Sequence, residues 1–302
     1  MLSLTKLIQF SNFYKRFNII SLILIILSVL ILIFKGLNFG VDFKGGTLIE
    51  LRTNDSVKIS VLRNAFVNMN LGDVNVKQFG KKNDYLVKIE TTNSKEDFIQ
   101  ELNEKLNLTI GSEINFRRVE NVGPKVSAEL LKDGLLAISL SLAAMLFYIW
   151  IRFEWQFSLG AITAIIHDVI ITLGMFSLLS YEVNLSIVAA VLTIVGYSMN
   201  DTVVIFDRIR ENLKKYSKIS ISEISNISTN ETLSRTLITS VTTLLALTAI
   251  YIFGGAILKG FSFAMILGVI VGTYSSIFIA TPILNYTNVS QKTILKEDQE
   301  NN

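Results

Sequence analysis

Length, composition and charge indicate a membrane protein. The 302-residue chain is 50% hydrophobic, has a mean hydropathy of +0.49 and carries 18% charged residues, against roughly 25% in soluble domains. It has no cysteine and one histidine, which excludes disulfides, thiolate chemistry and multi-histidine metal sites, so no cofactor is expected. The net charge of +3 does not indicate nucleic-acid binding, because basic residues beside membrane spans explain it.

Six apolar runs are long enough to be membrane-spanning helices, since about 20 helical residues cross ~30 Å of hydrocarbon. The first run is followed by Lys35 rather than by a small-residue cleavage site, so we expect a retained anchor and not a signal peptide. The sequence therefore predicts a multi-pass α-helical membrane protein with six transmembrane helices. The predicted spans are residues 17–34, 134–151, 157–179, 185–206, 237–258 and 261–284.

Basic residues are concentrated on one side of this pattern. They precede the first run, follow the sixth and gather between the fourth and fifth, whereas residues 181–184 contain none. By the positive-inside rule, both termini are expected in the cytoplasm. The same rule predicts a cytoplasmic loop over residues 207–236 and a cytoplasmic tail over 287–302, and it leaves residues 36–132 outside.

The long segment after the first span has the pattern of a folded α+β domain. Alternating apolar residues predict strands over 47–52, 74–79, 85–90 and 113–119, and helical spacing predicts helices over 57–69 and 94–106. Residues 80–84 are expected to form a hairpin loop, and Ser94 to cap the second helix. The order βαββαβ is typical of a ferredoxin-like domain, here exported between the first and second transmembrane helices.

A mixed-charge amphipathic helix is predicted over residues 124–133, directly before the second span. It is either an interfacial lever arm or a plain linker helix on the membrane surface.

The expected domains are residues 1–35, with the N-terminus and first span; 36–132, with the exported domain and interfacial helix; 133–286, with five spans; and the tail 287–302.

Asp168 lies inside the third apolar run, where a charged side chain needs an explanation because it costs ~2.5–3.5 kcal/mol at mid-bilayer. It is about 11 residues into the run, or ~16 Å deep, near the membrane midplane. Gly160 and Ala164 share its helical face, so Asp168 is expected to face the helix bundle. The alternative is a structural hydrogen bond from neutral Asp168 or from His167.

Asp201 lies near the cytoplasmic end of the fourth run, buried but not central. Tyr197 and Ser198, one turn earlier, add hydroxyls to its face, and Asn200 is adjacent, which predicts a polar track toward the cytoplasm. An unpaired carboxylate there would take up a proton, whereas a nearby arginine would keep it ionised.

Arg235 opens a polar stripe on the fifth span that contains Thr239, Thr242 and Thr243. Such a narrow polar stripe suits a helix that faces a hydrated interior. The alternative is that Arg235 extends to cytoplasmic headgroups, as basic residues at span ends usually do. If Arg235 pairs with ionised Asp201, protonation of Asp201 would weaken the attraction and allow the bundle to repack.

Glycines on the last span fit a packing contact. Gly268 and Gly272 are four residues apart, the spacing at which small residues let two membrane helices approach closely. Gly45 and Gly46 lack the lysine and following helix of a phosphate loop, so they are expected to permit tight turns.

Several stretches together resemble the SecF family, whose members are the six-helix subunits of bacterial SecDF complexes. The similarity runs in order along nearly the whole chain. The stretches are residues 39–47, 122–126, 152–155, 167–168, 196–204, 206–212, 232–236 and 272–276.

The resemblance implies a subunit of the bacterial inner membrane, with residues 36–132 in the periplasm. Its partners would be a SecD-like subunit, the SecYEG channel, YajC and YidC-like accessory proteins, translocating polypeptides and protons. Together with the SecD-like partner it would form a twelve-span assembly that uses the proton gradient at a late step of protein export. The resemblance favours Asp201 and Arg235 as the proton-linked pair, with His167 and Asp168 as further members.

Three other readings stay open. The first is half of a resistance-nodulation-division-type exporter of lipids or hydrophobic solutes, although its exported domains are usually much larger. The second is an intramembrane protease built on Asp168 and Asp201, but the sequence shows no paired catalytic motif, so we expect no enzyme. The third is a structural assembly subunit with inert polar residues.

Overall fold

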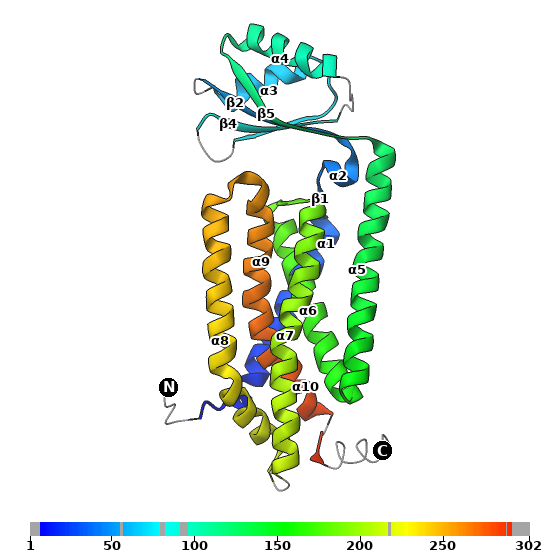
Figure 1. The fold of residues 1–302 in the computed structure, drawn as a ribbon, viewed down its shortest axis with the longest axis vertical. Helices are drawn as coiled ribbons and strands as arrows, with labels where there is room; N and C mark the ends of the chain where they lie inside the picture. The colour runs from blue at the N-terminus through cyan, green and yellow to red at the C-terminus, as the bar shows by residue number, and fades with distance from the viewer. Residues whose placement is uncertain are drawn as a thin grey trace. The chain divides into compact units, whose positions relative to one another are not determined.

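The computed structural model describes residues 7–291, apart from 55–56, 79–81, 91–95, 217–218 and 288. It contains two compact units (Figure 1). We call Met1–Asn38, Ala137–Tyr181 and Ser186–Asn302 the helical unit, and Phe39–Leu136 with Glu182–Leu185 the α+β unit.

Six helices in the described residues are long and apolar enough to cross a membrane, which confirms the predicted number. The last of them is not a single regular helix, because a π-helical turn interrupts it. The elements are η1 (Phe10–Phe13) with α1 (Tyr14–Lys35), α5 (Pro124–Arg152), α6 (Trp155–Leu179), α7 (Leu185–Lys215), α8 (Ile221–Phe253), and α9 (Gly255–Ser275) with η2 (Ser276–Ala280) and α10 (Thr281–Tyr286).

Most of residues 207–236, the predicted cytoplasmic loop between two spans, is helical in the structure. α7 continues to Lys215 and α8 begins at Ile221. The Ser220 hydroxyl caps α8 by accepting a hydrogen bond from the Glu223 amide. Hydropathy finds only the apolar part of a helix, so it missed both polar ends; the Ser-x-x-Glu capping pattern was the available signal.

The predicted helix over residues 124–133 is present, but it does not end before the second span, because these residues are the first part of α5, which continues to Arg152 without a break. The change from mixed charge to apolar sequence does not mark a helix boundary. Gly134 is the only weak helix former near the junction, and one glycine costs about 1 kcal/mol, too little to end a 29-residue helix.

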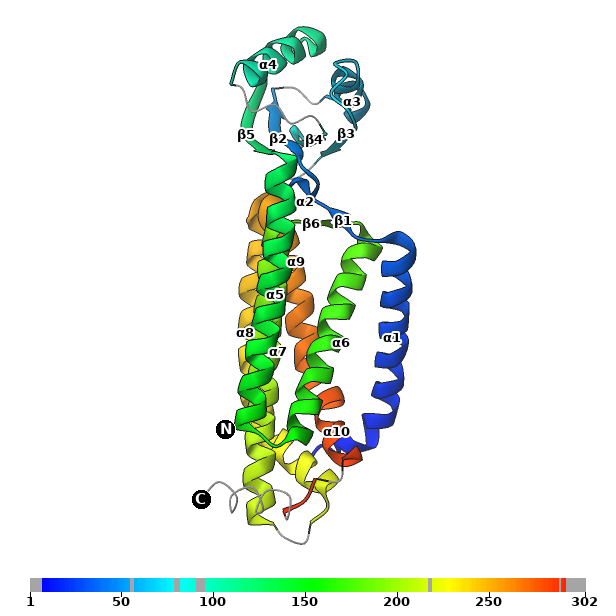
Figure 2. The same cartoon turned by 90° about the vertical axis from the view of Figure 1, so that its right-hand side faces the viewer.

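Three helices are the most buried of the helical unit, and Figure 2 shows two of them, α6 and α9, between α1 and α8. The most apolar windows of α6, α7 and the last span are each 50% buried, whereas those of α1, α5 and α8 are 11–17% buried. The core includes Phe157, Phe206 and Ile277, which come from α6, α7 and η2. The buried faces of α6, α7 and α9 can therefore hold polar side chains inside the protein.

The predicted glycine contact is present between α9 and α7. A Cβ at Gly268 would lie 2.2 Å from Ile194 Cγ1, and one at Gly272 would lie 3.0 Å from Ser198 Cβ. Because real Cβ atoms are not found so close to other atoms, these glycines fix how near α9 can approach α7.

Gly268→Ala is expected to lower the stability of the folded protein by about 1–3 kcal/mol, because its methyl group overpacks this contact. Gly196→Ala is the matched control, since a Cβ there meets nothing within 4 Å; it is expected to be neutral or stabilising by up to about 1 kcal/mol. Thermal unfolding of both variants in detergent measures the difference. Equal melting temperatures would contradict the contact.

The α+β unit has the predicted βαββαβ order. Its four-stranded sheet has the order β3-β4-β2-β5, and every neighbouring pair is antiparallel. Ile49 and Leu51 face the core formed with α3 and α4, whereas Glu50 and Arg52 face away. The elements are β2 (Gly46–Thr53), α3 (Ile59–Val67), β3 (Val74–Gln78), β4 (Asp84–Ile89), α4 (Glu96–Ile110) and β5 (Ile114–Val122).

The ferredoxin-like order is thus confirmed, although residues 80–81 of the predicted hairpin loop over 80–84 and the Ser94 cap lie outside the described residues. Gly45 and Gly46 have positive φ angles of 78° and 118°. A Cβ at Gly46 would also lie 2.5 Å from the Ile89 carbonyl oxygen, so the turn into β2 requires glycine there. Three short elements precede or join this unit: β1 (Asn38–Phe39), α2 (Val41–Lys44) and β6 (Glu182–Val183).

Candidate functional site

Asp168 is the centre of a buried polar network. Its side chain on α6 is 1% exposed. Gly160 and Ala164 lie on the same buried face, as the spacing predicted. The Asp168 carboxylate therefore points into the helical unit, not toward lipid.

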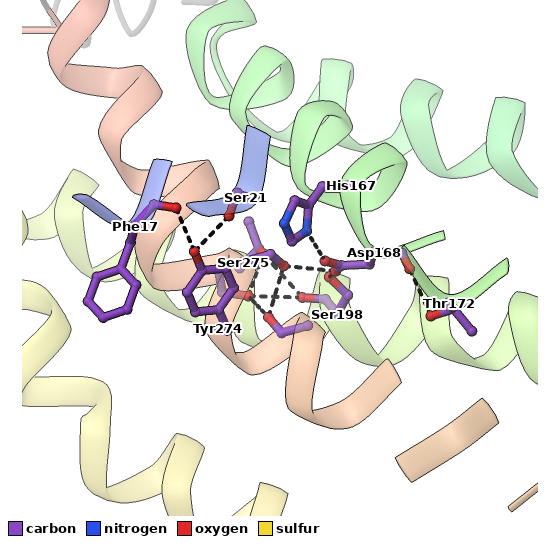
Figure 3. Close-up of polar contacts among 11 residues, drawn as sticks. Phe17, Ser21, His167, Asp168, Thr172, Ser198, Tyr274 and Ser275 are labelled. Carbon is purple, nitrogen blue, oxygen red and sulfur yellow. Dashed lines mark hydrogen bonds and ion pairs between the residues drawn. The ribbon is translucent and has the colours of Figure 1, made fainter. Parts of the chain in front are cut away.

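Both Asp168 oxygens have partners from neighbouring groups (Figure 3). Oδ1 is 2.8 Å from His167 Nδ1. Oδ2 accepts hydrogen bonds from Ser198 Oγ at 2.6 Å and Ser275 Oγ at 2.8 Å. One carboxylate thus joins α6, α7 and α9, and a change in its charge acts on all three interior helices.

Hydroxyl groups continue the network along α7 and η2. Thr202 Oγ1 and Ser276 Oγ are 2.8 Å apart, and Ser276 Oγ also donates to the Gly272 carbonyl at 2.8 Å. The Ser198 carbonyl accepts from Thr202 Oγ1 at 3.1 Å. Each hydroxyl can both donate and accept, so the hydrogen bond between Thr202 and Ser276 can run in either direction, whereas the bonds to the two carbonyls cannot be reversed.

His167 connects Asp168 to α1. Its ring stacks on Tyr274 with a centroid distance of 5.9 Å. The Tyr274 hydroxyl donates to the Phe17 carbonyl at 2.8 Å and lies 2.6 Å from Ser21 Oγ (Figure 3). His167 Nδ1 faces Asp168, and Nε2 is a buried nitrogen without a hydrogen-bond partner in the described residues.

Asp201 is a second buried carboxylate, 3% exposed, on the same helix as Ser198. Its Oδ2 is buried and has no hydrogen-bond partner in the part of the chain that the structure describes. The Thr273 hydroxyl lies next to the carboxylate, and the Arg235 guanidinium acts on its charge from farther away. Thr273 is itself 2.8 Å from Ser240 on α8.

Asp201 and Arg235 are not in direct contact. No salt bridge joins them among the described residues, although both are described, and Arg235 is exposed. The structure therefore brings Asp168, His167 and Ser198 together, while it keeps Arg235 apart from Asp201.

The predicted threonine stripe on α8 lies largely outside the buried network. Thr242 is exposed and donates to the Ile238 carbonyl of its own helix, and Thr239 donates to the Arg235 carbonyl. Thr243 is half-buried and accepts from Tyr197 Oη at 3.4 Å. The buried hydroxyl face of α8 carries Thr232, Thr236 and Ser240 instead. Asn200 on α7, which was also predicted as part of the polar track, is exposed.

The network members that were not predicted as site residues include Ser21, Thr202, Thr273, Tyr274, Ser275 and Ser276. Thr202 and residues 273–276 fall in stretches that carry the family resemblance, but a hydroxyl inside an apolar run is common in membrane helices and does not show where it points.

The spans, the buried carboxylates and the α+β unit together define a multi-pass membrane protein whose interior helices share an ionisable network, a pattern typical of transport proteins. The sequence profile described as protein export membrane protein SecD/SecF, C-terminal, matches residues 102–290, and the SecD/SecF GG motif matches residues 30–57. The chain belongs to the SecD/SecF family of protein export membrane proteins.

Relatives named protein translocase subunit SecF are similar over most of the chain. The one from Rickettsia bellii (strain OSU 85-389) is 45% identical over 280 residues, which cover 91% of this chain and 92% of the relative. The one from Cereibacter sphaeroides is 44% identical over 266 residues, covering 85% of this chain and 82% of the relative. The family resemblance predicted from the motifs is therefore confirmed.

Solved SecDF structures have the same fold. The crystal structure of SecDF, a translocon-associated membrane protein from Thermus thermophilus, is 34% identical, with a TM-score of 0.86 over 96% of this chain. SecDF in its super-membrane-facing form is 33% identical, with a TM-score of 0.70 over 100% of this chain. The chain spans 40% of the length of each of these SecDF chains.

Proposed function

We propose that this chain is a SecF-type translocase subunit that works with a SecD-like partner in the bacterial inner membrane. It uses the proton gradient to assist protein export at a late step. The observation that carries the proposal is the convergence of α6, α7 and α9 on one buried carboxylate, Asp168. A charge in such a position is costly and marks an ion pathway in membrane proteins.

Asp201 is the proposed proton carrier. Both oxygens of Asp168 are engaged, whereas Oδ2 of Asp201 is buried without a partner. A proton can therefore be added to Asp201 without breaking an existing hydrogen bond. His167 and Asp168 are proposed to respond to protonation of Asp201 through the hydroxyl groups on α7.

Arg235 is the proposed counter-charge. When Asp201 is ionised, attraction to Arg235 draws α8 toward α7, and protonation removes that attraction. The membrane potential supplies the bias, because one charge moved through 100 mV is worth ~2.3 kcal/mol. That energy is comparable with the few kcal/mol that separate protein conformers.

A SecD-like partner is proposed because the chain corresponds to less than half of a SecDF chain. Arg235, Asn200 and Thr242 are exposed on this chain alone, and such groups need protein or water beside them instead of lipid. The SecYEG channel, YajC, YidC-like proteins and translocating polypeptides are further proposed partners, on the family's pattern.

The proposed orientation follows the basic residues. Both termini lie in the cytoplasm and residues 36–132 lie in the periplasm, because the arginines and lysines gather beside the cytoplasmic ends of the spans.

Export into inverted membrane vesicles tests the proposal. Vesicles contain the chain with its SecD-like partner, the chain alone, or neither, and export is measured with the gradient present and then collapsed by an uncoupler. We expect gradient-dependent stimulation only when both proteins are present. Full stimulation by the chain alone would refute the need for a SecD-like partner. Stimulation that survives the uncoupler would refute proton coupling.

A further inference from the structure

Glu182–Leu185, which end the loop between α6 and α7 and begin α7, belong to the α+β unit, whereas the rest of both helices belongs to the helical unit. Its strand β6 pairs with β1, and the Gly40 amide donates to the Val183 carbonyl at 2.8 Å. The end of this loop is thus held by the chain that follows the first span.

Asp42 binds the first residue of α7. Its Oδ2 accepts a hydrogen bond from the Leu185 amide at 2.8 Å. The first amides of a helix have no partner within the helix and form its positive end. A carboxylate at this place therefore fixes the helix end both by a hydrogen bond and by its charge.

Lys88 on β4 connects the central sheet to the same loop. Its Nζ donates to the Phe39 carbonyl at 3.1 Å and lies 3.6 Å from Glu182 Oε1. Partial burial lowers the pKa of Lys88, and Glu182 opposes that shift. We call the contacts of Gly40, Asp42 and Lys88 with residues 182–185 the clamp.

From the clamp, α7 runs without interruption to Ser198 and Asp201. These residues lie 13 and 16 positions after Leu185, or about 20 and 24 Å along a rigid helix. We infer that Asp42 is a positioning residue that fastens α7 to the α+β unit, so that movement of this unit and rearrangement of the Ser198 and Asp201 region are mechanically coupled. This inference rests on the proposed export function.

Asp42→Ala in the assembled complex tests the clamp directly. Hydrogen exchange of a peptide that covers residues 182–190 is expected to rise roughly tenfold or more in the loop, because a hydrogen bond to a charged group is lost. Gradient-dependent export is expected to fall with unchanged amounts of complex. Asp73→Ala, which removes an exposed carboxylate of the same unit, is expected to change neither quantity. Unchanged exchange in Asp42→Ala would overturn the clamp.

An engineered disulfide provides a second test of the clamp, because the chain has no cysteine of its own that could form other disulfides. A Cβ at Gly40 would lie 3.3 Å from Asn184 Cβ, just below the ~3.5–4.5 Å of disulfides. Gly40 has φ −74°, which any residue adopts. Gly40→Cys with Asn184→Cys, added to Asp42→Ala, is expected to restore gradient-dependent export when oxidised and to lose it when reduced.

The outcomes distinguish a failure of the clamp inference from a failure of the proposed export function. If the oxidised clamp fails to restore export while the same cysteine pair is active with Asp42 intact, the coupling role is wrong. If the unmodified complex shows no gradient-dependent export, the proposed function fails, and the exchange measurement still decides whether Asp42 holds the loop.

Discussion

Asp201→Asn is expected to abolish gradient-dependent stimulation of export while the protein still inserts and assembles with its SecD-like partner. Asparagine preserves the size of the side chain and one acceptor oxygen, but it cannot take up and release a proton. The measurement is export into inverted vesicles that contain equal amounts of complex, with the gradient present and then collapsed.

Thr193→Val is the matched control for Asp201→Asn, because Thr193 is an exposed polar residue of the same helix whose hydroxyl donates only to the Ala189 carbonyl. We expect it to export normally. If the role of Asp201 is only structural, export would fall in proportion to the amount of assembled complex. Full gradient-dependent export by Asp201→Asn would show that the carrier is another group, with Asp168 the next candidate.

Asp168→Ala is expected to lower the free energy of unfolding by about 2–4 kcal/mol. The change removes the acceptor of the Ser198 and Ser275 hydroxyls, and a buried polar group left without a partner costs about 1–3 kcal/mol. Ser275 can still donate to the Gly272 carbonyl at 3.1 Å. The groups that lose their hydrogen-bond partner are therefore mainly Ser198 and His167. Thermal or denaturant unfolding in detergent measures the change.

Asp168→Asn is the comparison, because an amide oxygen can still accept from both serines. We expect it to be clearly more stable than Asp168→Ala. If the alanine variant were as stable as the parent, the network would contribute nothing to holding α6, α7 and α9 together.

Much of the fold was predictable because its signals are local. A spanning helix is a continuous apolar run, and the strands of the α+β unit alternate with period two, so six spans and the βαββαβ order follow from the sequence. Helix ends did not follow in the same way. The polar turns of α7 and α8 beyond the hydrocarbon, and the junction inside α5, contain no apolar signal, and their capping residues were needed instead.

The candidate site was predictable only in part, because its contacts join different helices. Gly160 and Ala164 indicated that Asp168 faces inward, since they lie on the same helix. The bonds from Ser198 and Ser275, and the stacking of Tyr274 on His167, depend on how α6, α7 and α9 pack. α8 carries hydroxyls on two faces, and the sequence pattern favoured the face with Thr239 and Thr242, whereas packing buries Thr236 and Ser240.

The π-helical turn η2 has a consequence for the geometry of the last span. At this turn the Thr281 hydroxyl donates to the Ser276 carbonyl at 2.8 Å, and Pro282 follows. A π turn contains one residue more than an α turn, so it offsets the angular phase of all later residues by about 100°. Ser275 can therefore face Asp168 while Ala280 meets α6 at Gly160. A single-residue deletion in η2 would leave the composition and hydropathy of the span almost unchanged, yet it would turn one half of the span away from the contacts that it makes.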